Sequence, residues 1–329
     1  MPGHGLKEVP LKRIVILSAV LIGCTDPGFV DVLGEAPEGA LLSVWGPSAE
    51  DVWIAGGQPE AGVLFRGSES TFETMTLPAD TPMLNWVHGT AANDVWVGGL
   101  SGTMLHWDGA GWTDHSEPVE EAIWGLYARG PEDVWFVGGE SRWGGETARV
   151  FHYDGLSMQS VELPTELGDV PNMFKVHDDG SRMWFVGAGG AAAFETEEGL
   201  RPAATGFSGD LVTANLGTAE TLIVVGGRGT GNVFEQEGER LTELTATPAG
   251  LNGVVGLPGH ALVVGESGFM AMVDRSDGTV TPIEVPVRDI LHAVWIAPDD
   301  TVYSVGGNLG TADPTFHGTL IVGPLPETP

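Results

Sequence analysis

Cysteine is almost absent from this chain of 329 residues, which contains a single one, Cys24. An intramolecular disulfide is therefore excluded. Positive charge is scarce as well, because 14 lysines and arginines stand against 45 aspartates and glutamates, for a formal net charge of −31. An acidic surface of that size repels nucleic acid and anionic lipid headgroups. We therefore expect no nucleic-acid partner, and we interpret the charge chiefly as favouring solubility outside the cytoplasm.

Recognisable catalytic motifs are missing too. The chain has no Gly-x-Ser-x-Gly elbow, no His-Glu-x-x-His pair and no phosphate loop. No helical pattern follows the glycine-rich run Gly226–Gly231, so we interpret it as a turn between strands. The acidic pairs Asp178-Asp179 and Asp299-Asp300 fall in predicted turns and offer too few ligands for a calcium site. We predict no catalytic residue and no cofactor, with calcium or another metal left open.

Apolar runs that could cross a bilayer are also lacking near the N-terminus. A basic start is followed by the apolar run Ile14–Ile22, which is too short to span a membrane and is typical of a signal peptide. It ends in Leu21-Ile22-Gly23-Cys24, which resembles the lipobox of bacterial lipoproteins. The resemblance implies removal of residues 1–23 and lipidation of Cys24. The alternative is an ordinary signal peptide with a chance cysteine.

A lipidated Cys24 would attach the chain to a membrane, since each buried methylene contributes about 0.8 kcal/mol. Residues 24–28 would then form a short lipidated tether. In enteric-type sorting an aspartate directly after the cysteine favours the inner membrane, whereas here Thr25 intervenes before Asp26. We therefore expect a cell-envelope protein, with the outer membrane favoured over the inner.

The chain is rich in glycine, with 50 glycine residues, and it contains a sequence repeat. The repeat is an apolar strand, a turn with Asp, then Val-Trp, two residues and Gly, and it is clearest around Trp53, Trp96 and Trp135. The seven copies share a glycine three residues after the Trp position: Gly56, Gly99, Gly138, Gly187, Gly226, Gly265 and Gly306. A period of about 40 residues is that of four-stranded propeller blades. The sequence thus predicts an all-β, seven-bladed β-propeller of four-stranded antiparallel blades.

The two recurring residues have architectural explanations. We expect the glycines to permit a close approach of backbones and unusual dihedral angles at a tight turn. We expect the tryptophans to pack between adjacent blades and not to bind a ligand.

The ends of the chain predict closure of the ring. The seventh copy lacks a fourth strand, and the segment Phe29–Leu33 resembles one without partners of its own. We predict that this N-terminal strand completes the last blade and removes the open edge. The propeller would then span residues 29–325, with a tail at 326–329.

Two phrases carry a family resemblance: Val44-Trp45-Gly46 leading into Asp51-Val52-Trp53, and Leu105-His106-Trp107-Asp108-Gly109 with Trp112. They resemble repeats of secreted β-propeller lipoproteins of myxobacteria and, more distantly, those of plant-type photosystem assembly factors. The resemblance covers nearly the whole mature chain and implies fold and export, but no reaction. The sialidase Asp-box is absent, which disfavours glycan hydrolysis.

Candidate binding residues lie on the first strands, which line a propeller's channel. Aligning these strands gives one column consisting of Trp45, His88, Tyr127, His177, Asn215, Val255 and Trp295. A second column, two residues earlier, consists of Ser43, Trp86, Gly125, Lys175, Thr213, Gly253 and Ala293. Period-two alternation places both columns on one face. His88, Tyr127, His177 and Asn215 come from consecutive blades and could converge on a metal or an anion; the alternative is a water-filled polar channel.

A further candidate is Trp143, in the long loop Glu140–Glu146 of the third copy, since an exposed aromatic in such a loop can bind a sugar, peptide or protein. The alternative is that it folds back over its blade. A second long loop begins at Asn308.

These observations together predict an envelope-anchored, monomeric, non-catalytic binding or scaffold propeller for a protein or polysaccharide. Two alternatives stay open. One is a polymer-acting lyase or hydrolase that uses the channel histidines and Tyr127, and the other is a metal- or calcium-binding propeller.

Overall fold

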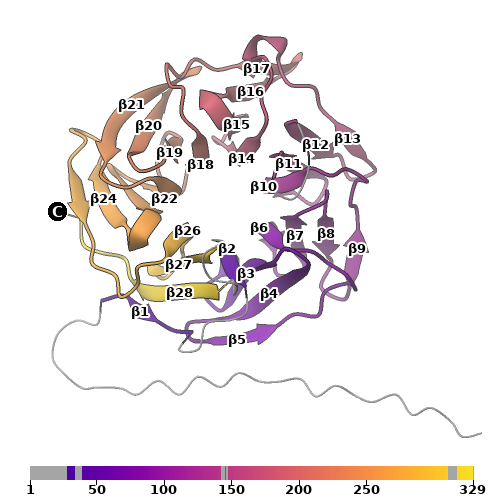
Figure 1. Ribbon diagram of the computed structural model, residues 1–329, viewed down its shortest axis with the longest axis horizontal. Coiled ribbons are helices and arrows are strands. Elements are labelled where there is room, and N and C mark those ends of the chain that lie inside the picture. The colour runs from indigo at the N-terminus through magenta and orange to yellow at the C-terminus, as the bar shows by residue number, and fades with distance from the viewer. Residues whose placement is uncertain (1–27, 34–38, 142–144, 146, 310–316, 329) are drawn as a thin grey trace, which may run out of the picture.

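The computed structural model of the protein describes residues 28–33, 39–141, 145, 147–309 and 317–328. Seven four-stranded antiparallel sheets stand side by side around a central axis (Figure 1). The predicted seven-bladed propeller is confirmed. No helix in the described ranges is long and apolar enough to cross a membrane. Cys24 and Trp143 lie outside the described residues.

Within each blade the strands follow chain order from the axis outward, except that the N-terminal strand is the outermost one in blade seven. The innermost strands are β2 (Ala40–Ser48), β6 (Leu84–Ala91), β10 (Ala122–Gly130), β14 (Met173–Asp178), β18 (Leu211–Asn215), β22 (Leu251–Leu257) and β26 (Ile290–Ile296). The second strands are β3 (Asp51–Gln58), β7 (Asp94–Gly99), β11 (Asp133–Gly139), β15 (Met183–Gly187), β19 (Ile223–Gly226), β23 (His260–Gly265) and β27 (Thr301–Asn308).

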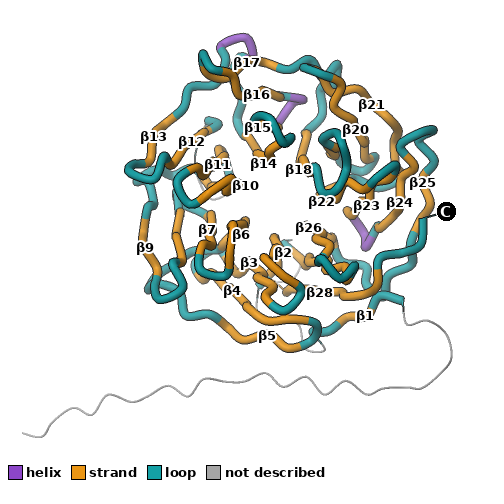
Figure 2. The backbone as a smooth tube through the Cα atoms, turned by 180° about the vertical axis from the view of Figure 1, so that it is seen from behind, coloured by secondary structure: helices purple, strands orange, loops and turns teal. Residues whose placement is uncertain are grey.

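The outer half of each blade is built in the same way. The third strands are β4 (Ala61–Ser68), β8 (Met104–Trp107), β12 (Arg149–Tyr153), β16 (Ala192–Thr196), β20 (Gly231–Glu237), β24 (Met270–Asp274) and β28 (His317–Pro324). The outermost strands are β5 (Thr71–Thr74), β9 (Trp112–Asp114), β13 (Met158–Ser160), β17 (Gly199–Pro202), β21 (Arg240–Thr247), β25 (Val280–Pro282) and β1 (Val30–Asp31). Loops and three short 3₁₀ turns, η1 (Thr165–Leu167), η2 (Ala188–Gly190) and η3 (Glu266–Gly268), connect them (Figure 2).

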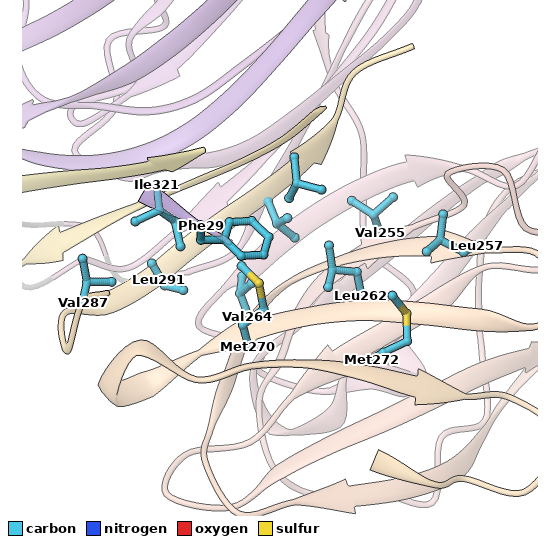
Figure 3. Close-up of a cluster of buried hydrophobic side chains, with 12 residues drawn as sticks. Phe29, Val255, Leu257, Leu262, Val264, Met270, Met272, Val287, Leu291 and Ile321 are labelled. Carbon is cyan, nitrogen blue, oxygen red and sulfur yellow. The ribbon is translucent and has the colours of Figure 1, made fainter. Parts of the chain in front are cut away.

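The N-terminal strand closes the ring as predicted. β1 pairs with β28 in blade seven, with Val30 opposite Val322, so the first and last described strands share one sheet. Phe29 packs into the cluster between blades six and seven, beside Val264 and Ile321 (Figure 3). The closed ring therefore depends on side chains at both ends of the propeller.

The tryptophan column packs between blades, as expected. Trp53, Trp96 and Trp184 are fully buried, and Trp135 nearly so. Each belongs to a hydrophobic cluster that includes residues of the next blade. The equivalent residues of the last three blades, Ile223, Leu262 and Tyr303, occupy the same kind of position. The loss of Trp in these copies therefore leaves the packing scheme intact.

The aspartate of the repeat holds a partner against that tryptophan. In blade two, Asp94 bonds the Nε2 atom of His106 at 2.8 Å, and the His106 ring stacks on Trp96 with centroids 4.3 Å apart. Blades one and three repeat this arrangement with Arg66 and His152, which lie over Trp53 and Trp135. The pattern explains why Asp and Trp stand two residues apart, because paired positions on neighbouring strands share a face.

The seven repeat glycines, which form one column when the copies are aligned, are explained by only one of the two causes expected for them. A Cβ atom built on any of the seven glycines would lie 1.9 to 2.5 Å from a backbone carbonyl oxygen beside the first strand. None of the seven has a positive φ, so the expectation of unusual dihedral angles was wrong. Those angles belong to the following glycine in some blades, as at Gly57 and Gly307. Close backbone approach alone accounts for the column.

Candidate functional site

Every innermost strand carries a β-bulge at the same place. The pairing with the second strand skips one residue, as between Leu84 and Trp86 in blade two. The seven skipped residues are Leu42, Asn85, Trp124, Phe174, Val212, Asn252 and His292. A bulge inserts one residue and changes which side chains share a face. The channel is therefore lined by three layers of side chains, where alternation predicted two.

The channel widens into a cavity near each mouth. The first cavity, of about 570 Å³, is lined by Trp45, His88, Tyr127, His177, Asn215, Val255 and Trp295, which form the column predicted from the sequence. The second, of about 600 Å³, is lined by all seven bulge residues. Trp86, Lys175 and Thr213 line both cavities and lie between them.

In the first cavity, aromatic rings from four consecutive blades form a continuous arc. The ring centroids of Trp45 and His88 are 5.3 Å apart, those of His88 and Tyr127 4.4 Å, and those of Tyr127 and His177 4.6 Å. We call these four residues the aromatic arc. The structure thus brings His88, Tyr127 and His177 together. Asn215 lies on the same wall, and its Oδ1 atom is buried without a hydrogen-bond partner.

The aromatic arc carries no charge at neutral pH. Burial, together with the nearby His177 ring, lowers the pKa of His88 to about 3, and burial lowers the pKa of His177 to about 4. His88 Nδ1 accepts a hydrogen bond from the Ala128 amide at 3.1 Å. The carbonyl oxygen of Asp178 lies 2.8 Å from His177 Nδ1, which must donate to it. Burial also raises the pKa of Tyr127. The arc therefore offers ring faces and a few fixed polar edges.

The described part of the chain offers no ligand set for a metal ion, because no three His, Cys, Asp or Glu side chains cluster there. The acidic pair at residues 178–179 is occupied by protein groups. Arg129 binds Asp178 at 3.0 Å, and Asp179 accepts from the indole of Trp184 at 2.7 Å. The first contact joins blades three and four and the second lies within blade four, so this pair acts in packing.

The second cavity was not foreseen, because a single inserted residue leaves no mark in an alternating pattern. Its wall combines aromatic rings with polar atoms that have no partner. Asn85 donates to the Ile123 carbonyl at 3.0 Å, yet its Oδ1 atom is buried and unpaired, as is Nε2 of His292. Burial lowers the pKa of His292 to about 4. In the sequence, each bulge residue directly follows an apolar residue at the start of the first strand of its copy. This shared position was the one signal that could have revealed the second cavity.

The fold and the channel define this chain as a closed seven-bladed propeller with two ligand-sized cavities on its axis. No family model and no curated protein sequence matches it. Among solved structures it is similar to "YCF48 bound to D1 peptide", with a TM-score of 0.65, 13% identity, and coverage of 92% of this chain and 98% of that one. It is also similar to YCF48 from Cyanidioschyzon merolae, with a TM-score of 0.65, 12% identity, and coverage of 90% and 98%.

A third similar structure is the WD40 β-propeller domain of Doa1, with a TM-score of 0.64, 10% identity, and coverage of 87% and 93%. At these identities the likeness shows the fold alone, and propellers serve many functions. The repeat and the propeller architecture are therefore shown, and the activity must be argued from the channel.

Proposed function

We propose that this protein is a binding scaffold of the bacterial cell envelope, which uses a channel mouth to hold a segment of a partner protein. The observation that carries the proposal is the aromatic arc, because four uncharged rings in contact line a cavity of about 570 Å³. The few residues that dominate binding energy at protein interfaces are enriched in Trp and Tyr. The similar propeller of YCF48 bound to D1 peptide makes a peptide segment a reasonable occupant.

The binding proposal predicts that Tyr127→Ala lowers recovery of the partner. Tyr127 stands in the middle of the arc, so its loss removes two ring contacts at once. In pull-downs from detergent extracts of the native envelope, we expect at least about a tenfold drop relative to the wild-type chain. Digestion of the captured material with protease identifies a protein partner, whereas sensitivity to periodate identifies a polysaccharide.

The matched control lies in the same blade. Leu156, in the hairpin between the two outer strands β12 and β13, is 92% exposed, whereas Tyr127 lies on the innermost strand β10. Leu156→Ala should recover as much partner as the wild-type chain. Equal recovery by all three chains would place the partner away from the arc, and no capture by the wild-type chain would refute the scaffold proposal.

The proposed scaffold includes anchoring through Cys24, at the outer membrane in preference to the inner. The support is the sequence itself, since the chain's single cysteine ends a signal-peptide pattern. We predict that Cys24→Ser abolishes incorporation of radiolabelled fatty acid and moves the protein from the membrane fraction to the soluble fraction. Density-gradient separation of the two membranes tests the preferred site. Continued labelling of the serine variant would contradict lipidation at this residue.

A further inference from the structure

Lys175 is the one lysine of the chain beyond residue 12, and it belongs to β14, the innermost strand of blade four. Its side chain extends from β14 into the channel, where it lines both cavities, and the residue is only 5% exposed. Gly125 on the neighbouring blade leaves room for its stem, because a Cβ atom there would lie 3.2 Å from Lys175 Cδ. A long basic side chain is thus buried where it borders both cavities of the channel.

Among the described residues, no carboxylate forms an ion pair with Lys175. Burial shifts its pKa well below the ordinary value for lysine. A buried amine without a counter-ion is more stable uncharged, because the desolvation cost falls on the charged form.

An uncharged amine has two N–H groups and one lone pair, and here the two N–H groups are accounted for. Nζ lies 2.9 Å from the centroid of the Trp86 ring, whose negative face attracts an N–H group. The second N–H points toward the Trp124 carbonyl oxygen at 3.4 Å. No hydrogen-bond donor among the described residues pairs with Nζ, and the residue lines both cavities.

We propose that Lys175 is a carbonyl-reactive amine, and that a small neutral aldehyde or ketone entering the channel forms an imine with Nζ. The lone pair attacks the carbonyl carbon to give a carbinolamine. The carbonyl oxygen then leaves as water with both amine hydrogens, and a C=N bond remains. No oxidant or reductant is needed. Desolvated lysines act as nucleophiles in this way.

A neutral carbonyl compound fits the site better than an anion. A carboxylate would have to approach a protein of net charge −31 and find a protonated amine. Cavities of about 570 and 600 Å³ are large enough for a substituted aromatic aldehyde, and their aromatic walls suit one. This reactivity goes beyond the proposed scaffold function and does not depend on it.

Reductive trapping on the unprocessed precursor, which retains residues 1–23, tests the proposal. Benzaldehyde is added with cyanoborohydride at pH 7, and mass spectrometry of peptides compares labelling at Lys175, Lys7 and Lys12. We expect Lys175 to be labelled at least about tenfold faster than the other two, because each unit of pKa depression raises the neutral fraction about tenfold. Labelling of Lys175 should rise less steeply between pH 7 and pH 9 than labelling of Lys7 and Lys12, because burial lowers the pKa of Lys175.

Three controls make the result decisive. In concentrated guanidinium chloride the three lysines should react alike, and Lys175→Arg should remove the fast reaction from the folded chain. Benzoate, which has the same ring with a carboxylate, should not protect Lys175. Labelling of Lys175 only after unfolding, or no faster than Lys7 and Lys12, would overturn the proposal. Protection by benzoate would also overturn it, since that result identifies an anion site.

Discussion

Replacing Gly265 with alanine is expected to destabilise the propeller by about 4 kcal/mol, which is at the upper end of single-residue effects. The added Cβ atom would lie 1.9 Å from the Gly250 carbonyl oxygen and 3.0 Å from Leu251 Cα, both of them backbone atoms. No side-chain rotation relieves such an overlap, so strands β22 and β23 must separate. Gly265 has φ of −173°, an extended conformation that any residue adopts. The cost is therefore one of space, and urea unfolding of the variant measures it.

Gly130→Ala is the matched control. Gly130 also ends a strand of the propeller, but a Cβ atom there would have no neighbour within 4 Å and its φ is not positive. Its free energy of unfolding should stay within about 0.5 kcal/mol of the wild-type value. Equal stability of the Gly265→Ala and wild-type chains would show that the glycine column has another cause.

The second large effect is expected at the closure of the ring. Phe29 and Val32 flank β1, and both are buried. Phe29 packs between blades six and seven, whereas Val32 joins the cluster between blades seven and one. Replacing both with alanine should cost about 4 kcal/mol, because each truncation leaves a cavity at an interface between blades. We expect β1 to detach from β28 and the ring to open at this point.

Hydrogen exchange measures this opening directly. Amides of β28 that lie next to β1 should lose protection before those of blades two to five, since exchange reports local opening. Val30→Ala provides the control on the same strand, because Val30 is 49% exposed. Unchanged protection of β28 in the double variant would mean that β1 is dispensable for closure. Cys24 precedes Phe29 by five residues, so a lipid attached there would be close in sequence to this closing strand.

The two kinds of candidate residue on the channel have different chemistry. The aromatic arc is held by ring stacking and by backbone hydrogen bonds, and its histidines are uncharged. Lys175, in contrast, has no ion-pair partner in the described ranges and sits where the two cavities meet. Binding of a partner at the arc and reaction of a carbonyl compound at the amine are therefore separable by substitution.

Several features were predictable because they recur. The seven regularly spaced glycines predicted the number of blades. The N-terminal segment was an unpartnered strand and the last copy lacked a fourth strand, which predicted that the two pair. The first-strand column could also be placed, because His88, Tyr127 and His177 follow the same offset in consecutive copies. Repetition makes such inferences possible, since each copy faces the same neighbours and tests the same alignment.

The sequence by itself determined the blade count, the closing strand and the burial of the tryptophans, because these depend on the repeat and on apolar patterning. Only the tertiary structure decided which side chains meet across blades. The bulge in each first strand turns an extra residue into the channel. The sequence Leu84-Asn85-Trp86 gives no sign of this bulge in its alternation of side chains. The placement of Lys175 on Trp86 likewise joins blades four and two. Such contacts arise from closing a ring, which brings residues far apart in the chain to one axis.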